Sequence, residues 1–148
     1  MPDSAKNPGA TMITAIPLTI VPLILFNIIG FADGSTNWST EIFGIVMVSG
    51  ARWALTLGDL MITFGIVILF LEVMKSGRTS TASVTNHILS TVVLIIYVVE
   101  LVVVAFCANS IFFILTLIAL FDVIAGFTIT IRTASRDVNF GQGFDAGP

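Results

Sequence analysis

Residues 88–131 read ILSTVVLIIYVVELVVVAFCANSIFFILTLIALFDVIAGFTITI, and this stretch decides the fold. It contains two apolar runs, 88–107 and 111–131, and each run holds fourteen Ile, Leu, Val or Phe residues and one carboxylate. A helix of about 20 residues crosses the hydrocarbon core of a bilayer, which is about 30 Å thick. Each apolar side chain favours insertion by roughly 0.3 to 0.6 kcal/mol, so together they outweigh one central carboxylate, which costs roughly 2.5 to 3.5 kcal/mol. The short link at 108–110 predicts that the two helices are antiparallel neighbours.

Two further apolar runs precede this pair. Residues 13–31 contain no charged side chain, and residues 60–74 contain one, near the end of the run. The first run is longer than the apolar part of a signal peptide, so we expect a retained helix. The sequence therefore predicts an all-α integral membrane protein, a four-transmembrane-helix bundle forming a single membrane domain over 1–148. The predicted helices cover 13–31, 59–77, 86–108 and 111–132, with an outer segment at 33–58 and a loose C-tail at 133–148.

The composition of the whole chain supports this class of protein. Of 148 residues, 56% are hydrophobic and 10% are charged, whereas a soluble domain carries about 25% charged residues. This composition argues against a soluble globular enzyme. The net charge of −3 argues against nucleic-acid binding, and the one cysteine argues against a disulfide framework.

The basic residues predict the orientation. In a four-span protein, both termini and the loop after the second span share one side of the membrane. Five basic residues fall on that side, and one, Arg52, falls on the other. The five are Lys6, Lys75, Arg78, Arg132 and Arg136. The positive-inside rule then predicts that both termini lie in the cytoplasm; the resemblance described below implies that the membrane is a bacterial inner (cytoplasmic) membrane.

The outer segment shows a β pattern. Two runs rich in β-branched and aromatic residues, 42–48 and 51–57, flank the pair Ser49-Gly50, which is typical of a hairpin turn. Trp38 and Trp53 suit a membrane–water interface. The sequence favours a short extracytoplasmic β-hairpin between the first two spans; the alternative is a short interfacial or re-entrant helix at 41–48.

Two of the membrane carboxylates have a structural interpretation. Asp59 follows a glycine and opens an apolar helix, which predicts a helix cap whose carboxylate accepts backbone N–H groups. Glu72 precedes Lys75 by three residues near the inner end of the second span. This spacing predicts an interfacial pair whose side chains reach water.

Glu100 and Asp122 are different, because neither has a basic residue within a helical turn or two. Counted from the link at 108–110, they lie at similar depths on neighbouring helices, with Tyr97 and Thr116 on the same faces. The sequence therefore predicts an intramembrane polar seam of these four residues. Three roles stay open: an internal hydrogen-bond cluster, a site for a cation of a partner protein, and a path for protons or sodium ions. Asn27 of the first span is a further candidate to hydrogen-bond this seam.

The string Leu57-Gly58-Asp59-Leu60 and the stretches LEVMKSGRT (71–79), FFILT (112–116) and DVIAGF (122–127) carry a resemblance. On these residues the chain resembles a group of uncharacterised small bacterial four-helix inner-membrane proteins. The resemblance covers the last two-thirds of the chain and implies membrane location and a four-span fold. It carries over no catalytic residue, because such proteins have no assigned activity.

Signals for other chemistry are missing from the sequence. His87 is the one histidine and is interpreted as an interfacial or capping residue, and Cys107 has no partner for a redox pair. No phosphate-binding loop or nucleophile–base motif occurs, so no enzyme, metal site or cofactor is predicted. The expected partners are the lipid bilayer and another membrane protein or a second copy. We expect a non-enzymatic accessory or scaffold subunit; the alternative is a small proton- or cation-coupled transporter or channel.

Overall fold

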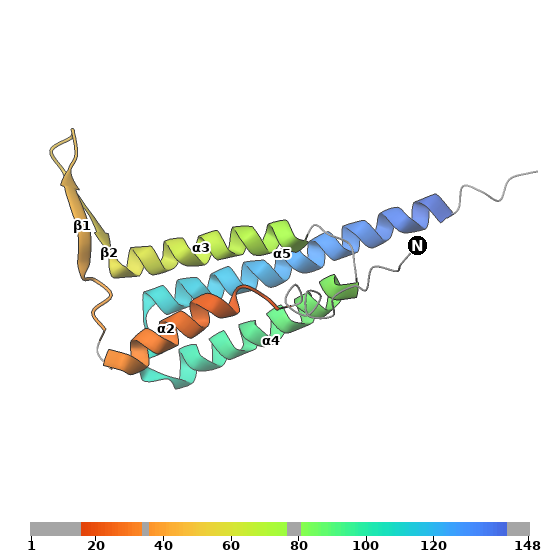
Figure 1. Ribbon diagram of the computed structural model, residues 1–148, viewed down its shortest axis with the longest axis horizontal. Helices are drawn as coiled ribbons and strands as arrows, with labels where there is room; N and C mark the ends of the chain where they lie inside the picture. Colours follow the sequence, from red (N-terminus) through yellow and green to blue (C-terminus); the bar gives the residue numbers. More distant parts are fainter. Residues whose placement is uncertain (1–15, 34–35, 77–80, 142–148) are drawn as a thin grey trace, which may run out of the picture.

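The computed structural model describes residues 16–33, 36–76 and 81–141. Four α-helices lie side by side with their axes roughly aligned, and a two-stranded sheet stands at one end of the bundle (Figure 1). The elements are α2 (Ile20–Asp33), β1 (Glu41–Val46), β2 (Arg52–Thr56), α3 (Leu57–Ser76), α4 (Thr81–Val103), the 3-10 turn η1 (Ala105–Cys107) and α5 (Ser110–Gly141).

Three of the helices are long and apolar enough to cross a membrane. The apolar windows are Leu57–Lys75, Thr85–Val103 and Ser110–Ile129. α5 lies against both α4 and α3 over most of their lengths (Figure 1). The prediction that α4 and α5 are neighbours is therefore confirmed.

The first helix is shorter than predicted. α2 has 14 residues and begins at Ile20, not at residue 13, so it is roughly 21 Å long. Pro17 lies before the helix and Pro22 lies in its first turn, where a missing N–H breaks no helical hydrogen bond. The start of the predicted helix, 13–15, falls outside the described residues.

The link between α4 and α5 is longer than predicted. α4 ends at Val103 instead of residue 108, and η1 follows it. Asn109 then caps α5, since its Oδ1 accepts the N–H groups of Ile111 and Phe112, each at 3.0 Å. Asparagine favours this position because its side chain satisfies the amides of the first helical turn.

The loose tail expected from residue 133 is wrong for 133–141, because α5 continues to Gly141. Extending an existing helix costs little compared with starting one, so a polar sequence can continue a helix that the apolar span has nucleated. Residues 142–148 lie outside the described part of the chain.

The β-hairpin is confirmed, and the alternative short helix at 41–48 is wrong. β1 and β2 pair antiparallel, with Ile45 opposite Trp53 and Val46 opposite Arg52. The loop has three residues, 48–50, rather than two: the Gly50 N–H donates to Met47 O at 2.9 Å, and Gly50 has φ +81°. A left-handed glycine after a type I turn is the usual way to close such a loop.

The strand β2 continues directly into α3, and a reciprocal cap fixes the junction. The Asp59 carboxylate accepts the Thr56 N–H at 2.9 Å, while the Asp59 N–H donates to Thr56 Oγ1 at 3.1 Å. This is a capping box with Thr56 as the N-cap. Asp59 therefore caps α3 as predicted, but from the third helical residue, because the helix starts two residues earlier than expected.

We expect Thr56→Ala to lower the free energy of unfolding by roughly 0.5–2 kcal/mol, the usual cost of losing an N-cap. Unfolding in detergent, followed by circular dichroism, measures this loss. Thr63→Ala is the matched control: its hydroxyl bonds to Asp59 O within the same helix, so its effect should stay within about 0.5 kcal/mol. Equal losses in the two variants would contradict the capping box.

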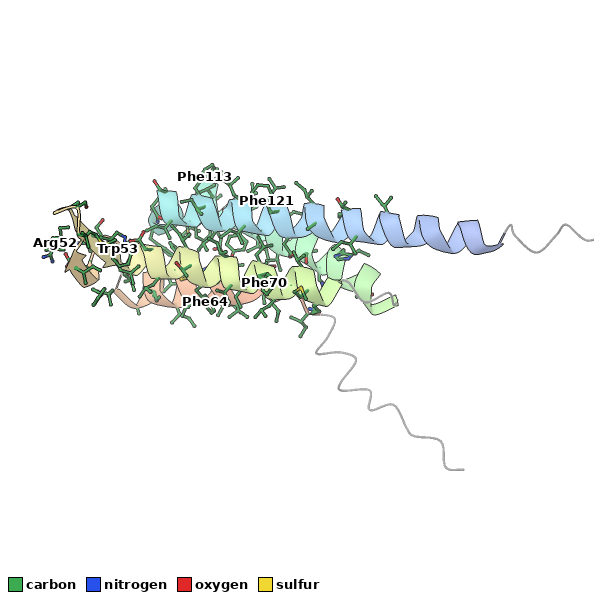
Figure 2. The ribbon with its side chains drawn as sticks, turned by 90° about the horizontal axis from the view of Figure 1, so that it is seen from above. Arg52, Trp53, Phe64, Phe70, Phe113 and Phe121 are labelled. Atoms are coloured by element: carbon green, nitrogen blue, oxygen red, sulfur yellow. The ribbon has the colours of Figure 1, made fainter. Side chains whose placement is uncertain are left out.

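The interior of the bundle is apolar and aromatic, and so is much of its outside. Phe26 stacks on Trp38 with ring centroids 4.5 Å apart and contacts Phe112 at 4.7 Å. Phe113 and Phe121 point outward on one flank of the bundle (Figure 2), and Phe70 of α3 is 63% exposed. An apolar outer surface of this extent is compatible with a lipid environment.

Candidate functional site

The polar groups of the bundle interior meet the segment that leads into α2. This lead-in segment, residues 16–19, is not helical, so its backbone groups need partners elsewhere. The Leu18 N–H donates to Glu72 Oε2 at 2.9 Å, and the Ile16 carbonyl accepts from Lys75 Nζ at 2.7 Å. Side chains of α3 thus satisfy backbone groups of the lead-in segment.

Glu72 is the centre of this arrangement. Its Oε1 lies 3.2 Å from Lys75 Nζ and also accepts from Asn86 Nδ2 of α4. Lys75 Nζ donates in turn to Asn86 Oδ1 at 3.1 Å. We call Glu72, Lys75 and Asn86 the Glu72 cluster.

The predicted Glu72–Lys75 pair is present, but its predicted exposure is wrong. The Glu72 side chain is 0% exposed and that of Lys75 is 24% exposed. The lead-in segment and α4 both contact the carboxylate. A spacing of three residues shows that two side chains share a helix face, but it carries no information on what covers that face.

Asp122 lies beside the Glu72 cluster. The Thr19 hydroxyl donates to Asp122 Oδ2 at 3.2 Å, and the Tyr97 hydroxyl donates to the Thr19 carbonyl at 3.2 Å. Asp122 and Tyr97 are 2% and 1% exposed. Glu72 and Lys75 are within electrostatic range of Asp122. Thr19 therefore joins two of the four residues of the predicted seam.

The other two residues of the seam have different partners. Glu100 Oε2 accepts from Asn27 Nδ2 at 2.7 Å, which confirms that Asn27 bonds a polar residue of the predicted seam. The Thr116 hydroxyl donates to Phe112 O, one turn back in its own helix, at 2.9 Å. The predicted seam is thus divided: Tyr97 and Asp122 meet at Thr19, while Glu100 bonds to Asn27.

The early end of α4 explains this division. Glu100 lies three residues from the end of α4, about 4.5 Å, whereas Asp122 lies twelve residues from the start of α5, about 18 Å. The depth estimate from sequence assumed a helix that continues to residue 108. The partners agree with the larger separation, since Thr19 precedes the first residue of α2 and Asn27 lies seven residues into that helix, roughly 10 Å along its axis.

Glu100 and Asn27 face a groove between α2 and α4. The groove has a volume of about 520 Å³. Its remaining lining is apolar and consists of Ile20, Leu23, Ile24, Ile28, Phe31 and Ile96. Ile28 and Ile24 are 60% and 50% exposed. A single polar pair is thus presented on an apolar outer face of the bundle.

His87 is not the interfacial residue that the sequence indicated. It is 2% exposed, and its ring covers Gly126 of α5 so closely that a Cβ at position 126 would overlap it. Glycine at 126 therefore allows α4 and α5 to approach at this level. The sequence did not predict that Asn86 and Thr19 lie in the interior of the bundle. The available indication was that each is a polar residue within or beside an apolar run.

The described part of the chain shows neither a metal site nor a reactive cysteine. No group of three His, Cys, Asp or Glu side chains lies together there as a metal site. Cys107 is 0% exposed, and burial, followed by the negative charge of Glu100, raises the pKa of its thiol to about 11. The thiol is therefore protonated at neutral pH, which disfavours nucleophilic or redox chemistry.

Comparison of the chain with protein-family models, curated proteins and solved structures finds no match. The class of protein rests on the fold itself, since residues 16–33, 36–76 and 81–141 form three candidate membrane spans, a short further helix and a small sheet.

Proposed function

We propose that this chain is a multi-pass protein of a bacterial inner membrane with both termini in the cytoplasm. Its function is that of a non-enzymatic accessory or scaffold subunit, whose α2–α4 groove receives a transmembrane helix of another membrane protein. The membrane location is supported by the three apolar helices, by the outward phenylalanines and by the resemblance carried by 57–60 and 71–79. This orientation takes α2 with its lead-in segment as a fourth crossing, and it is supported by the unequal distribution of basic residues.

The observation that carries the subunit role is the Glu100–Asn27 pair in its apolar groove. A carboxyl group facing hydrocarbon is costly in either protonation state unless a partner satisfies it. Asn27 provides one neutral donor. Of the described side chains, the two that carry a full positive charge, Lys75 and Arg52, bond to Glu72 and Glu41. A partner helix with a basic or hydrogen-bond-donating side chain at this depth would complete the site.

Site-specific photo-crosslinking in intact cells, followed by purification in mild detergent, tests this role. A crosslinker at Ile28, within the groove, should capture one foreign membrane protein, and Glu100→Gln should abolish that product. A crosslinker at Phe121, which is as exposed as Ile28 but lies on α5, should not capture it. Glu41→Gln, on the hairpin, is the control substitution and should retain it.

The subunit proposal fails if the product at Ile28 survives Glu100→Gln, or if Ile28 captures only a second copy of this chain. Size-exclusion chromatography of the Glu100→Gln protein checks that the loss is not caused by unfolding.

The alternative function, proton- or cation-coupled transport, is favoured by a different observation. Asp122 and the Glu72 cluster form a buried charged group beside non-helical backbone. Non-helical backbone at membrane depth lines ion sites in transporters. Reconstituted protein should then show an ion flux that Asp122→Asn abolishes and Glu100→Gln leaves unchanged. Glu100→Gln therefore separates the two functions, because it should abolish the crosslinked product but not the flux.

A further inference from the structure

One face of the hairpin is apolar, and the other carries an ion pair beside the exposed side chain of Val46. In the register of β1 and β2, Phe43 lies opposite Leu55 and Ile45 lies opposite Trp53, so these four side chains share a face. Phe43 and Trp53 make an edge-to-face contact with centroids 6.4 Å apart. Phe43, Ile45 and Trp53 are between 41% and 52% exposed. This aromatic face is therefore largely uncovered.

The opposite face carries an ion pair. Arg52 bonds to Glu41, with side chains 63% and 41% exposed. Simple alternation would place Glu41 on the side of Phe43, but the register shifts between these two residues. Such a bulge re-aims one side chain to the other face. The irregular position in β1 therefore keeps the charged pair off the aromatic face.

The hairpin runs across the helix axes instead of along them, and it extends sideways past α3 (Figure 1). Figure 2 shows Arg52 on the side of the hairpin away from the helices and Trp53 on the side toward them. The aromatic face is thus turned toward the region that surrounds the bundle, and the ion pair is turned away from it.

The base of the hairpin is held firmly on α3. The first amides of α3 donate to the chain that precedes β1: Leu57 N–H to Thr40 O and Gly58 N–H to Trp38 O, each at 2.9 Å. A Cβ at position 58 would lie 2.5 Å from Ile111 Cδ1 and 3.2 Å from Trp38 O, so glycine permits this close approach. With the capping box at Thr56, these contacts fix the direction in which the hairpin leaves the bundle.

We propose that the hairpin is a membrane-surface anchor, lying flat on the outer leaflet with Phe43, Ile45, Trp53 and Leu55 in the interfacial lipid and the Glu41–Arg52 pair in water. This inference rests on the proposed insertion of the helices into a membrane. The outward surface of α3 is apolar as well, since Phe70 and Ile66 are 63% and 53% exposed. Tryptophan and phenylalanine suit the interfacial depth.

The lipid chemistry follows from the charges. The hairpin carries one arginine and one glutamate, and these bond to each other. It therefore presents no net positive charge to anionic headgroups, and its insertion depends on apolar and aromatic contact. A bilayer of zwitterionic phosphatidylcholine is therefore sufficient for the aromatic face to insert.

The test places a nitroxide label on either face of the hairpin in the full chain, reconstituted in phosphatidylcholine vesicles. The labels are attached to Ile45→Cys and to its neighbour Val46→Cys, which lies on the Arg52 face, in a Cys107→Ala background. Oxygen concentrates in hydrocarbon and a nickel chelate stays in water. The ratio of oxygen to nickel collisions should be several-fold higher at 45 than at 46, with or without added anionic lipid.

A label at Phe70→Cys separates failure of this inference from failure of membrane insertion. If position 70 is in lipid while 45 and 46 are equally accessible to nickel, the anchor is wrong and the membrane protein stands. If position 70 is itself in water, the proposed insertion fails. Protection of position 45 from both reagents would show a protein contact, such as a second copy, and would also overturn the anchor.

A second measurement needs no label. In the Trp38→Phe protein, Trp53 is the one remaining tryptophan. Its fluorescence should be quenched more strongly by phospholipids brominated near the headgroup than by those brominated near the end of the acyl chain. Quenching by aqueous acrylamide alone would overturn the anchor.

Discussion

Replacing Glu72 by alanine is expected to lower the free energy of unfolding by about 3–5 kcal/mol, which is the usual cost of removing one partner from a buried ion pair. The loss arises because Glu72 has three kinds of partner: the Leu18 N–H, Asn86 Nδ2 and Lys75 Nζ. Removing the carboxylate leaves the Leu18 N–H without its acceptor and the Lys75 charge without its counter-ion. Unfolding in detergent, monitored by circular dichroism, gives the magnitude.

Glu41→Ala is the matched control, because Glu41 is also paired with a basic residue but is exposed to water. Its cost should be about 0.2–1 kcal/mol. The double change Glu72→Leu with Lys75→Met should recover much of the stability, since replacing a whole buried pair by apolar groups is often neutral. A small, equal loss in Glu72→Ala and Glu41→Ala would contradict the buried cluster.

The second large effect is expected at Phe26, which is 0% exposed and joins α2 to both the Trp38 loop and α5. Phe26→Ala should cost about 3 kcal/mol, at the low end of the range for soluble cores. The low end applies because lipid is as apolar as the interior of the bundle. The hydrophobic effect therefore contributes little to the loss of stability, which comes mainly from lost packing contacts. The same unfolding measurement applies.

Phe121→Ala is the control for this substitution, because Phe121 is 57% exposed and points outward from α5 (Figure 2). Its effect should stay within about 0.5 kcal/mol. If Phe121→Ala proved as costly as Phe26→Ala, the outward face of α5 would be a packed protein interface and not a lipid-facing surface.

The sequence by itself determined the local elements. The apolar runs at 60–74, 88–107 and 111–131 indicated three long helices, because helix type and approximate length follow from side chains close together in the chain. The β-hairpin followed equally from alternation around Ser49-Gly50. The capping role of Asp59 was also local, since it depends on residues within one turn.

The tertiary structure alone decided which polar residues meet. The spacing of Glu72 and Lys75 predicted an exposed pair. In the structure the lead-in segment, 54 residues away in the chain, bonds to Glu72. Glu100 and Asp122 were expected to lie in one polar seam at similar depth, but α4 ends at Val103, and the resulting shift in depth gives each carboxylate a different partner. The physical reason is that depth accumulates at 1.5 Å per residue from the point where each helix ends. An error of five residues at one end therefore moves a side chain past its expected partner, and a pattern of spacing along one helix carries no information about where another segment docks.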